Sequence, residues 1–124
     1  MTPTTPGGPP FALVRVSGRS MEPTLHAGDL LLVTRLGRAV RAGDVVVCDL
    51  PADGHGRPRP RAVKRVTGRD PDDPARWWID SDNPGAGVTS FDPTVGSLAD
   101  DAVRGRVLLR ISRRKGRWSP RRVH

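Results

Sequence analysis

Ser20-Met21-Glu22-Pro23-Thr24-Leu25, followed by Gly28-Asp29 and the apolar run Leu30 to Val33, is the segment from which the architecture can be read. Upstream, Ala12 to Val16 predicts a short strand that ends near Gly18. Ser20 is therefore expected on a turn at the tip of a strand. Such a position leaves a hydroxyl exposed while the sheet behind it stays rigid, which suits a nucleophile.

A serine nucleophile needs a base to activate it near neutral pH, and Lys64 is the candidate. In a strand, Ala62, Lys64 and Val66 share one face, so Lys64 lies on an apolar side. Burial of an ammonium lowers its pKa and favours the neutral form that a general base requires. The alternative interpretation is a lysine that reaches solvent from an edge strand.

The chain predicts a mainly β fold with one small domain of short strands. Two units, Ala27-Gly28-Asp29 and Ala42-Gly43-Asp44, each place a Gly-Asp turn before a continuous apolar run, which is typical of buried strands. Gly105 is expected to mark a bulge in the last strand. We expect strands at residues 11–17, 30–35, 45–50, 62–67, 75–80 and 102–111. We expect a flexible arm at residues 1–10, the domain at 11–111 and a basic tail at 112–124.

Composition narrows the class of protein. The chain has 124 residues and a net charge of +8, which suits an acidic partner such as nucleic acid, anionic lipid or an acidic peptide. Its one cysteine, Cys48, permits no internal disulfide. No signal peptide or apolar run long enough for a membrane helix is evident, so we expect no transmembrane anchor and a cytoplasmic protein, with the membrane periphery as the alternative. Three scattered histidines and one cysteine give no metal site, and no cofactor is expected.

Three blocks in order resemble the signal peptidase I family of Ser-Lys peptidases. They are Ser20 to Leu25 with Gly28-Asp29, Val63-Lys64-Arg65-Val66 with Gly68, and Ser81-Asp82-Asn83-Pro84. The anchorless form is most similar to the maturation proteases of nickel-type superoxide dismutase. The resemblance implies the small β fold that signal peptidases share with repressor peptidases, with Ser20 as nucleophile and Lys64 as general base.

The resemblance also implies roles around this pair. Gly18 occupies a position where some members carry an oxyanion-binding serine, so backbone N–H groups would bind the oxyanion. Asp82 and Asn83 would position the catalytic lysine, with an Asx-type turn as the alternative. Met21 and Leu25 would line the substrate groove, and core packing is the other role open to Leu25.

Further downstream, the family usually has a hydroxyl that contacts the lysine. Thr89 and Ser90 are the candidates for it in this chain.

The function expected is removal of an N-terminal propeptide from a precursor protein, with the nickel-type superoxide dismutase precursor as the substrate. A self-cleaving repressor domain is disfavoured, because the arm has no Ala-Gly or Cys-Gly bond. A signal peptidase acting at the membrane through its basic tail remains an alternative. A noncatalytic basic β-domain is a third possibility, although nucleic acid is not the expected partner.

Overall fold

The computed structural model describes residues 10–35, 40–114 and 117–123. The strands are β1 (Phe11–Arg15), β2 (Leu30–Thr34), β3 (Val45–Cys48), β4 (Ala62–Asp70), β5 (Asp73–Asp80), β6 (Leu98–Ala99), β7 (Val103–Arg114) and β8 (Arg117–Arg122), and the helical turns are η1 (Pro84–Ala86) and η2 (Asp100–Ala102). The prediction of a mainly β fold is confirmed.

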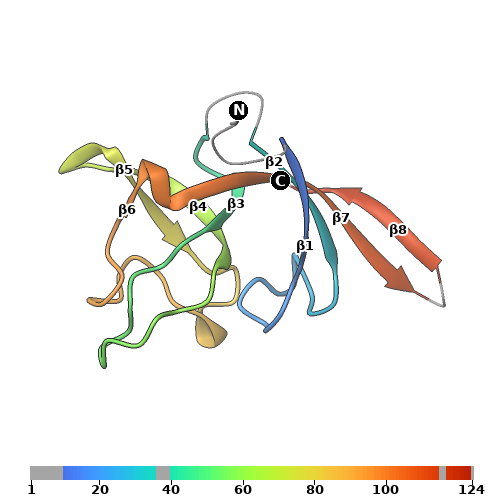
Figure 1. Ribbon diagram of the computed structural model, residues 1–124, viewed down its shortest axis with the longest axis horizontal. Coiled ribbons are helices and arrows are strands. Elements are labelled where there is room, and N and C mark those ends of the chain that lie inside the picture. Colours follow the sequence, from blue (N-terminus) through green and yellow to red (C-terminus); the bar gives the residue numbers. More distant parts are fainter. Residues whose placement is uncertain (1–9, 36–39, 115–116, 124) are drawn as a thin grey trace, which may run out of the picture.

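The strands form one curled antiparallel sheet in the order β1-β2-β7-β3-β4-β5-β6, with β8 paired to β7. Strand β7 holds the sheet together, because its first part pairs with β3 and its later part pairs with β2 and β8. Figure 1 shows β7 crossing the molecule from the region of β3 to the β7–β8 hairpin. Distant parts of the chain are thereby joined in one scaffold.

Strand β7 carries a bulge beside Gly105, as the sequence predicts. A Cβ built on Gly105 would lie 2.6 Å from Cγ1 of Val33 and 3.1 Å from the carbonyl oxygen of Thr34. The pairing of β3 with β7 shifts register between Val47 and Cys48, which is the signature of a bulge. Glycine is therefore required here by close packing.

The two Gly-Asp turns have the same local structure. Gly28 and Gly43 adopt φ values of +92° and +95°, which side chains other than glycine rarely tolerate. In each turn the aspartate accepts a hydrogen bond from the backbone three residues earlier, at 2.9 Å from His26 N to Asp29 and 2.9 Å from Arg41 N to Asp44. Both turns then deliver the chain into a buried strand, as their shared sequence pattern indicates.

The chain ends differently from the expectation. Residues 112–124 were expected to form a basic tail, but β7 continues to Arg114 and pairs with β8 from Leu109↔Arg122 to Arg114↔Arg117. Main-chain hydrogen bonds of a hairpin do not depend on side-chain charge, so arginines do not prevent pairing at an edge. Strand β6, only two residues long, was also not predicted.

Two apolar clusters pack against the sheet. The first joins β2, β3, β7 and the Ser20 turn, with Val14 of β1 packed against it. Its buried members are Val16, Met21, Leu25, Leu31, Val33, Val45, Val47 and Val107. The second lies under β3, β4, β5 and β6, with buried Val46, Cys48, Val66, Trp77, Ile79, Val95 and Leu98. The Ser20 turn thus belongs to one cluster, while the strands around Lys64 contribute to the other.

Candidate active site

Lys64 lies in the interior of the protein. It is the third residue of β4, and its side chain is only 3% exposed, on the apolar side that strand alternation predicts. Its Nζ donates a hydrogen bond to Ser81 Oγ at 2.8 Å. Burial lowers the pKa of Lys64 below its ordinary range, although the negative charges that Cys48 and Asp80 would carry act in the opposite direction. Lys64 is thus suited to the neutral form.

Ser81, directly after β5, provides the hydroxyl that contacts Lys64. Its Oγ donates to the carbonyl oxygen of Val88 at 2.7 Å, so the oxygen lone pairs remain for the lysine. The expectation that Thr89 or Ser90 fills this role is wrong. Ser90 Oγ accepts from the backbone N of Ile79 at 2.8 Å, and Thr89 Oγ1 accepts from Phe91 N at 3.1 Å. Both hydroxyls stabilise the loop instead.

Gly87 shows where Ser20, Ser81 and Lys64 converge. A Cβ built on Gly87 would come within 3.0 Å of Ser20 Cβ, Ser81 Oγ and Lys64 Nζ. The three side chains therefore border the same small space, although they come from the Ser20 turn, the end of β5 and the middle of β4. Sequence reasoning missed both Ser81 as the lysine's partner and Gly87 as the glycine that leaves room for it.

Asn83 holds the Ser20 turn by its main chain. Its backbone N donates to the carbonyl oxygen of Ser20 at 2.8 Å, and its Nδ2 donates to that of Arg19 at 3.0 Å. Asn83 therefore fixes the backbone of the candidate nucleophile. No hydrogen bond from Asn83 to Lys64 is present among the described residues.

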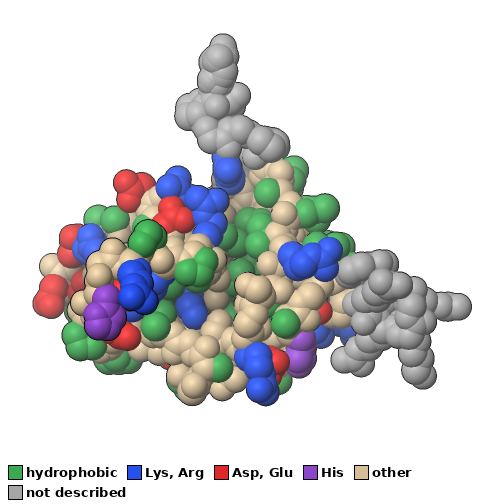
Figure 2. Space-filling view, turned by 60° about the horizontal axis from the view of Figure 1, so that its bottom comes forward, with side chains coloured by type: hydrophobic (Ala, Val, Ile, Leu, Met, Phe, Trp, Pro, Cys, Tyr) green, Lys and Arg blue, Asp and Glu red, His purple; other side chains and the backbone are tan. Residues whose placement is uncertain are grey.

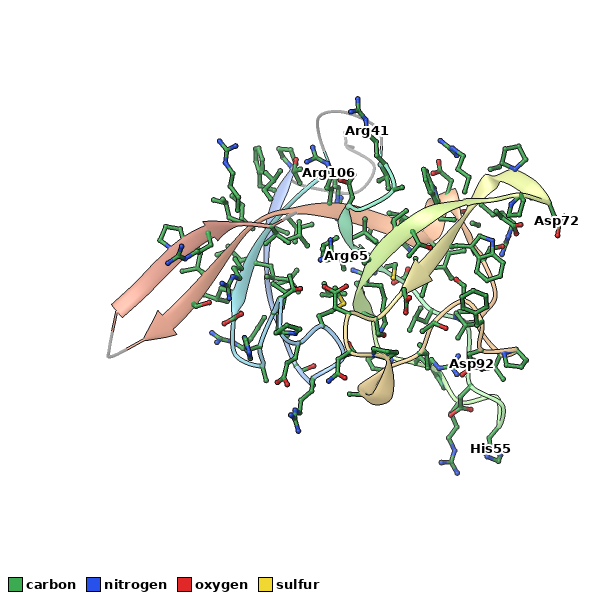
Figure 3. The ribbon with its side chains drawn as sticks, turned by 180° about the vertical axis from the view of Figure 1, so that it is seen from behind. Arg41, His55, Arg65, Asp72, Asp92 and Arg106 are labelled. Carbon is green, nitrogen blue, oxygen red and sulfur yellow. The ribbon has the colours of Figure 1, made fainter. Side chains whose placement is uncertain are left out.

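Asp82 links the same turn to β4. It receives two hydrogen bonds of 2.8 Å from the guanidinium of Arg65, and Thr24 Oγ1 donates to its Oδ2 at 2.5 Å. The bond from Arg65 is the main reason that the pKa of Asp82 is lowered. Figure 3 shows Arg65 near the middle of the molecule, between the strands and the loops below them. Asp82 was expected to position the lysine, but its contacts are with the turn and with the residue beside Lys64.

Gly18 stands two residues before Ser20 with φ of +78°, a left-handed conformation that favours glycine. It directs the chain from β1 into the Ser20 turn. That turn is closed at its base, where Val16 N donates to Asp29 O and Gly28 N donates to Val16 O, both at 2.8 Å. The Ser20 backbone is thus held from both ends of the turn.

A cleft of about 310 Å³ opens beside Ser20. One wall is the end of β1 with the residues that follow it, and the other is the segment from Arg59 to Val63. Met21 lines the cleft, as expected, and is also packed in the first apolar cluster. Leu25 is fully buried in that cluster and does not line the cleft, so its position fits the core-packing alternative.

Nothing in the described part of the chain resembles a metal centre. There, no three His, Cys, Asp or Glu side chains lie close enough to hold an ion. Figure 3 places His55 at the tip of a loop, far from Arg65 and hence from the adjacent Lys64. No helix among the described residues is long and apolar enough to cross a membrane.

The comparisons with known proteins give one match. The model of the family described as signal peptidase, peptidase S26, matches residues 9–73, which is more than half of the chain. The matched range includes Ser20 and Lys64 but ends before Ser81. No curated protein and no solved structure matches the chain.

Proposed function

This chain belongs to the signal peptidase family, peptidase S26, and we propose that it hydrolyses peptide bonds with a catalytic dyad of Ser20 and Lys64. The family indicates a serine peptidase acting on a protein substrate. The observation that supports the dyad is the convergence of Ser20 and the buried Lys64 Nζ on the space beside Gly87.

The chemistry begins with a neutral Lys64. Its Nζ donates to Ser81 Oγ, which leaves the nitrogen lone pair for the proton of Ser20 Oγ. The serine oxygen then attacks the scissile carbonyl carbon, and the protonated Nζ returns its proton to the leaving amine. In the second half, Lys64 removes a proton from water, which attacks the acyl carbon. The bond from that carbon to Ser20 Oγ then breaks, Nζ returns the proton to Ser20 Oγ, and the new carboxylate leaves.

The developing oxyanion needs hydrogen-bond donors that are fixed before reaction. The backbone N–H of Ser20 is the proposed donor. Support comes from the way the turn is held, because Asn83 bonds the Ser20 carbonyl and Gly18 sets the entry of the chain. Asp82 contributes indirectly by tying Thr24 to Arg65.

The substrate we propose is a precursor protein from which an N-terminal propeptide is removed. The resemblance of the sequence blocks around Ser20 and Lys64 to maturation proteases supports the precursor of nickel-type superoxide dismutase as the substrate, and a cytoplasmic site of action would accompany it. Cleavage would expose the new N-terminus that binds nickel.

Intact-mass analysis of the purified precursor after incubation with the protein tests both proposals. We expect loss of an N-terminal segment with the native chain and none with Ser20→Ala or Lys64→Ala. Equal cleavage by all three would refute the dyad. If none cuts this precursor, the substrate is wrong, and a peptide library must show Ser20-dependent cleavage for the peptidase proposal to stand.

A further inference from the structure

The cleft beside Ser20 combines an apolar floor with a cationic rim. Its described lining includes three arginines, Arg15, Arg59 and Arg61, and no aspartate or glutamate. Figure 2 shows hydrophobic side chains at the bottom of the hollow and Lys or Arg side chains on both sides of it. A peptide lying in this cleft therefore meets positive charge that no carboxylate of the lining offsets.

Within the described residues, Arg59 is held in place by hydrogen bonds and makes no ion pair. Its guanidinium donates to the carbonyl oxygens of Pro51 and Ala52 at 3.0 and 3.2 Å and to Thr94 Oγ1 at 2.8 Å. None of these acceptors is charged. Asp92 accepts from Thr94, whose hydrogen bonds are the main reason that the pKa of Asp92 is lowered, and the charge of Arg59 is the smallest contribution. Arg59 thus presents a fixed positive charge at the cleft.

Arg61 adds to this charge. It shares Asp49 with Arg104, at 2.8 and 2.7 Å, so two guanidinium groups are balanced by one carboxylate. The Arg61 side chain is itself about half exposed, at 54%, and is available to a ligand. The rim between Arg59 and Arg61 is therefore net positive.

The distance from the reacting atoms limits which part of a peptide reaches this rim. Pro60, between the two arginines, precedes Lys64 by a few residues, and an extended chain advances about 3.3 Å per residue. A substrate strand that begins at Ser20 and lies along residues 59–63 would reach the arginines with a side chain roughly four residues from its scissile bond.

We propose that this cleft selects extended peptides that carry an aspartate or glutamate within about four residues of the scissile bond, with Arg59 binding the carboxylate. The proposal rests on the peptidase function proposed above and names its substrate class as acidic near the cut. An ionised carboxylate accepts strong, directional hydrogen bonds from a guanidinium, which glutamine cannot match.

The test uses a library of short synthetic peptides, with products identified by mass spectrometry. Each peptide that is cut is then compared with partners in which glutamate replaces glutamine, one position at a time, on both sides of the scissile bond. At one position or more we expect kcat/KM to be about fivefold higher for glutamate, as partly exposed charge pairs give. This preference should shrink at high ionic strength.

Substitutions of Arg59 show whether this residue causes the preference for glutamate. Arg59→Gln should abolish the preference, Arg59→Lys should retain most of it, and Arg59→Glu should reverse it in favour of lysine-containing peptides. The matched control is Arg57→Gln, because Arg57 lies exposed in the same loop and does not line the cleft. Ser20-dependent cleavage that is indifferent to glutamate, or a preference that survives Arg59→Gln, would overturn this inference and leave the peptidase function intact. Absence of Ser20-dependent cleavage of every peptide would overturn both.

Discussion

At the scale of single residues, the hydroxyl of Ser81 determines where the lone pair of Lys64 points. It accepts from Nζ at 2.8 Å and is itself fixed by its bond to Val88 O. Ser81→Ala should therefore lower kcat by about 100-fold, since small errors in the position of a catalytic group are that costly, while KM changes little. The pH–kcat profile should shift to lower pH, because the protonated Nζ loses more stabilisation than the neutral amine when the acceptor is removed.

Ser90→Ala is the matched control for this prediction. Ser90 is as buried as Ser81, but it accepts from Ile79 N and does not contact Lys64. Its loss should reduce the free energy of unfolding by about 1–3 kcal/mol, because a buried N–H loses its partner. kcat per folded molecule and the pH profile should stay unchanged. Equal kinetic effects of the two substitutions would contradict a positioning role for Ser81.

Sequence alone could place Lys64 but not Ser81. Alternation along a strand fixes the face of Lys64 without reference to any other element. The contact with Ser81 depends on how β4 and β5 pair, with Arg65 opposite Asp80 and a register shift between Val66 and Gly68. Such an irregularity has no local sequence signal, so a hydroxyl further along the loop was expected instead.

At the scale of elements, the loop that follows β5 must pass very close to the reacting groups. Gly87→Ala should reduce kcat by at least about 100-fold, because the new Cβ would displace Ser20, Ser81 or Lys64. Gly87 has φ of −159°, an extended conformation open to any residue, so backbone strain is not the cause. Steady-state kinetics, with circular dichroism to verify folding, would measure the effect.

Gly85→Ala is the control for steric displacement. A Cβ at Gly85 would meet only Asn83 Oδ1, at 4.0 Å, although Gly85 lies two residues from Gly87 in the same loop. Near-native kinetics are therefore expected for Gly85→Ala. An active Gly87→Ala enzyme would show that the loop moves away from the site during catalysis.

The strands differ in how well their own residues predict them. Continuous apolar runs identified β2 and β3, since burial of both faces leaves that pattern. Strand β8 carries mostly polar and charged residues and is stabilised by main-chain pairing with β7. Such an edge strand depends on its neighbour rather than on its own composition.

At the scale of the whole molecule, the site lies between two apolar clusters, and no short sequence motif predicts how these clusters are placed relative to each other. Met21 anchors the Ser20 turn in the first cluster. Val66, two residues after Lys64, and Ile79, two residues before Ser81, pack in the second. Their relative placement comes from β7 and β3, which connect distant segments through long-range pairing. The order of motifs predicts which residues take part, but only the sheet determines their distances.

Burial of Lys64 should also affect the stability of the whole protein. The folded pKa of Lys64 is lowered by burial, while the unfolded chain keeps the ordinary value of 10.5. Below the folded pKa the folded state carries the full cost of this difference. The cost disappears as pH rises from the folded pKa towards 10.5, because the unfolded state then loses its proton as well. The native protein should therefore gain stability over this alkaline window.

Lys64→Met tests this expectation, because methionine fills a similar volume without an ionisable group. At neutral pH the variant should be inactive yet more stable by about 1–2 kcal/mol, in line with other buried charges replaced by apolar residues. Urea unfolding at several pH values would show this gain shrinking as pH approaches 10.5. Arg57→Met, which removes an exposed cation, should show no such trend. A Lys64→Met protein less stable than the native chain at neutral pH would mean that the bond to Ser81 outweighs the cost of burial.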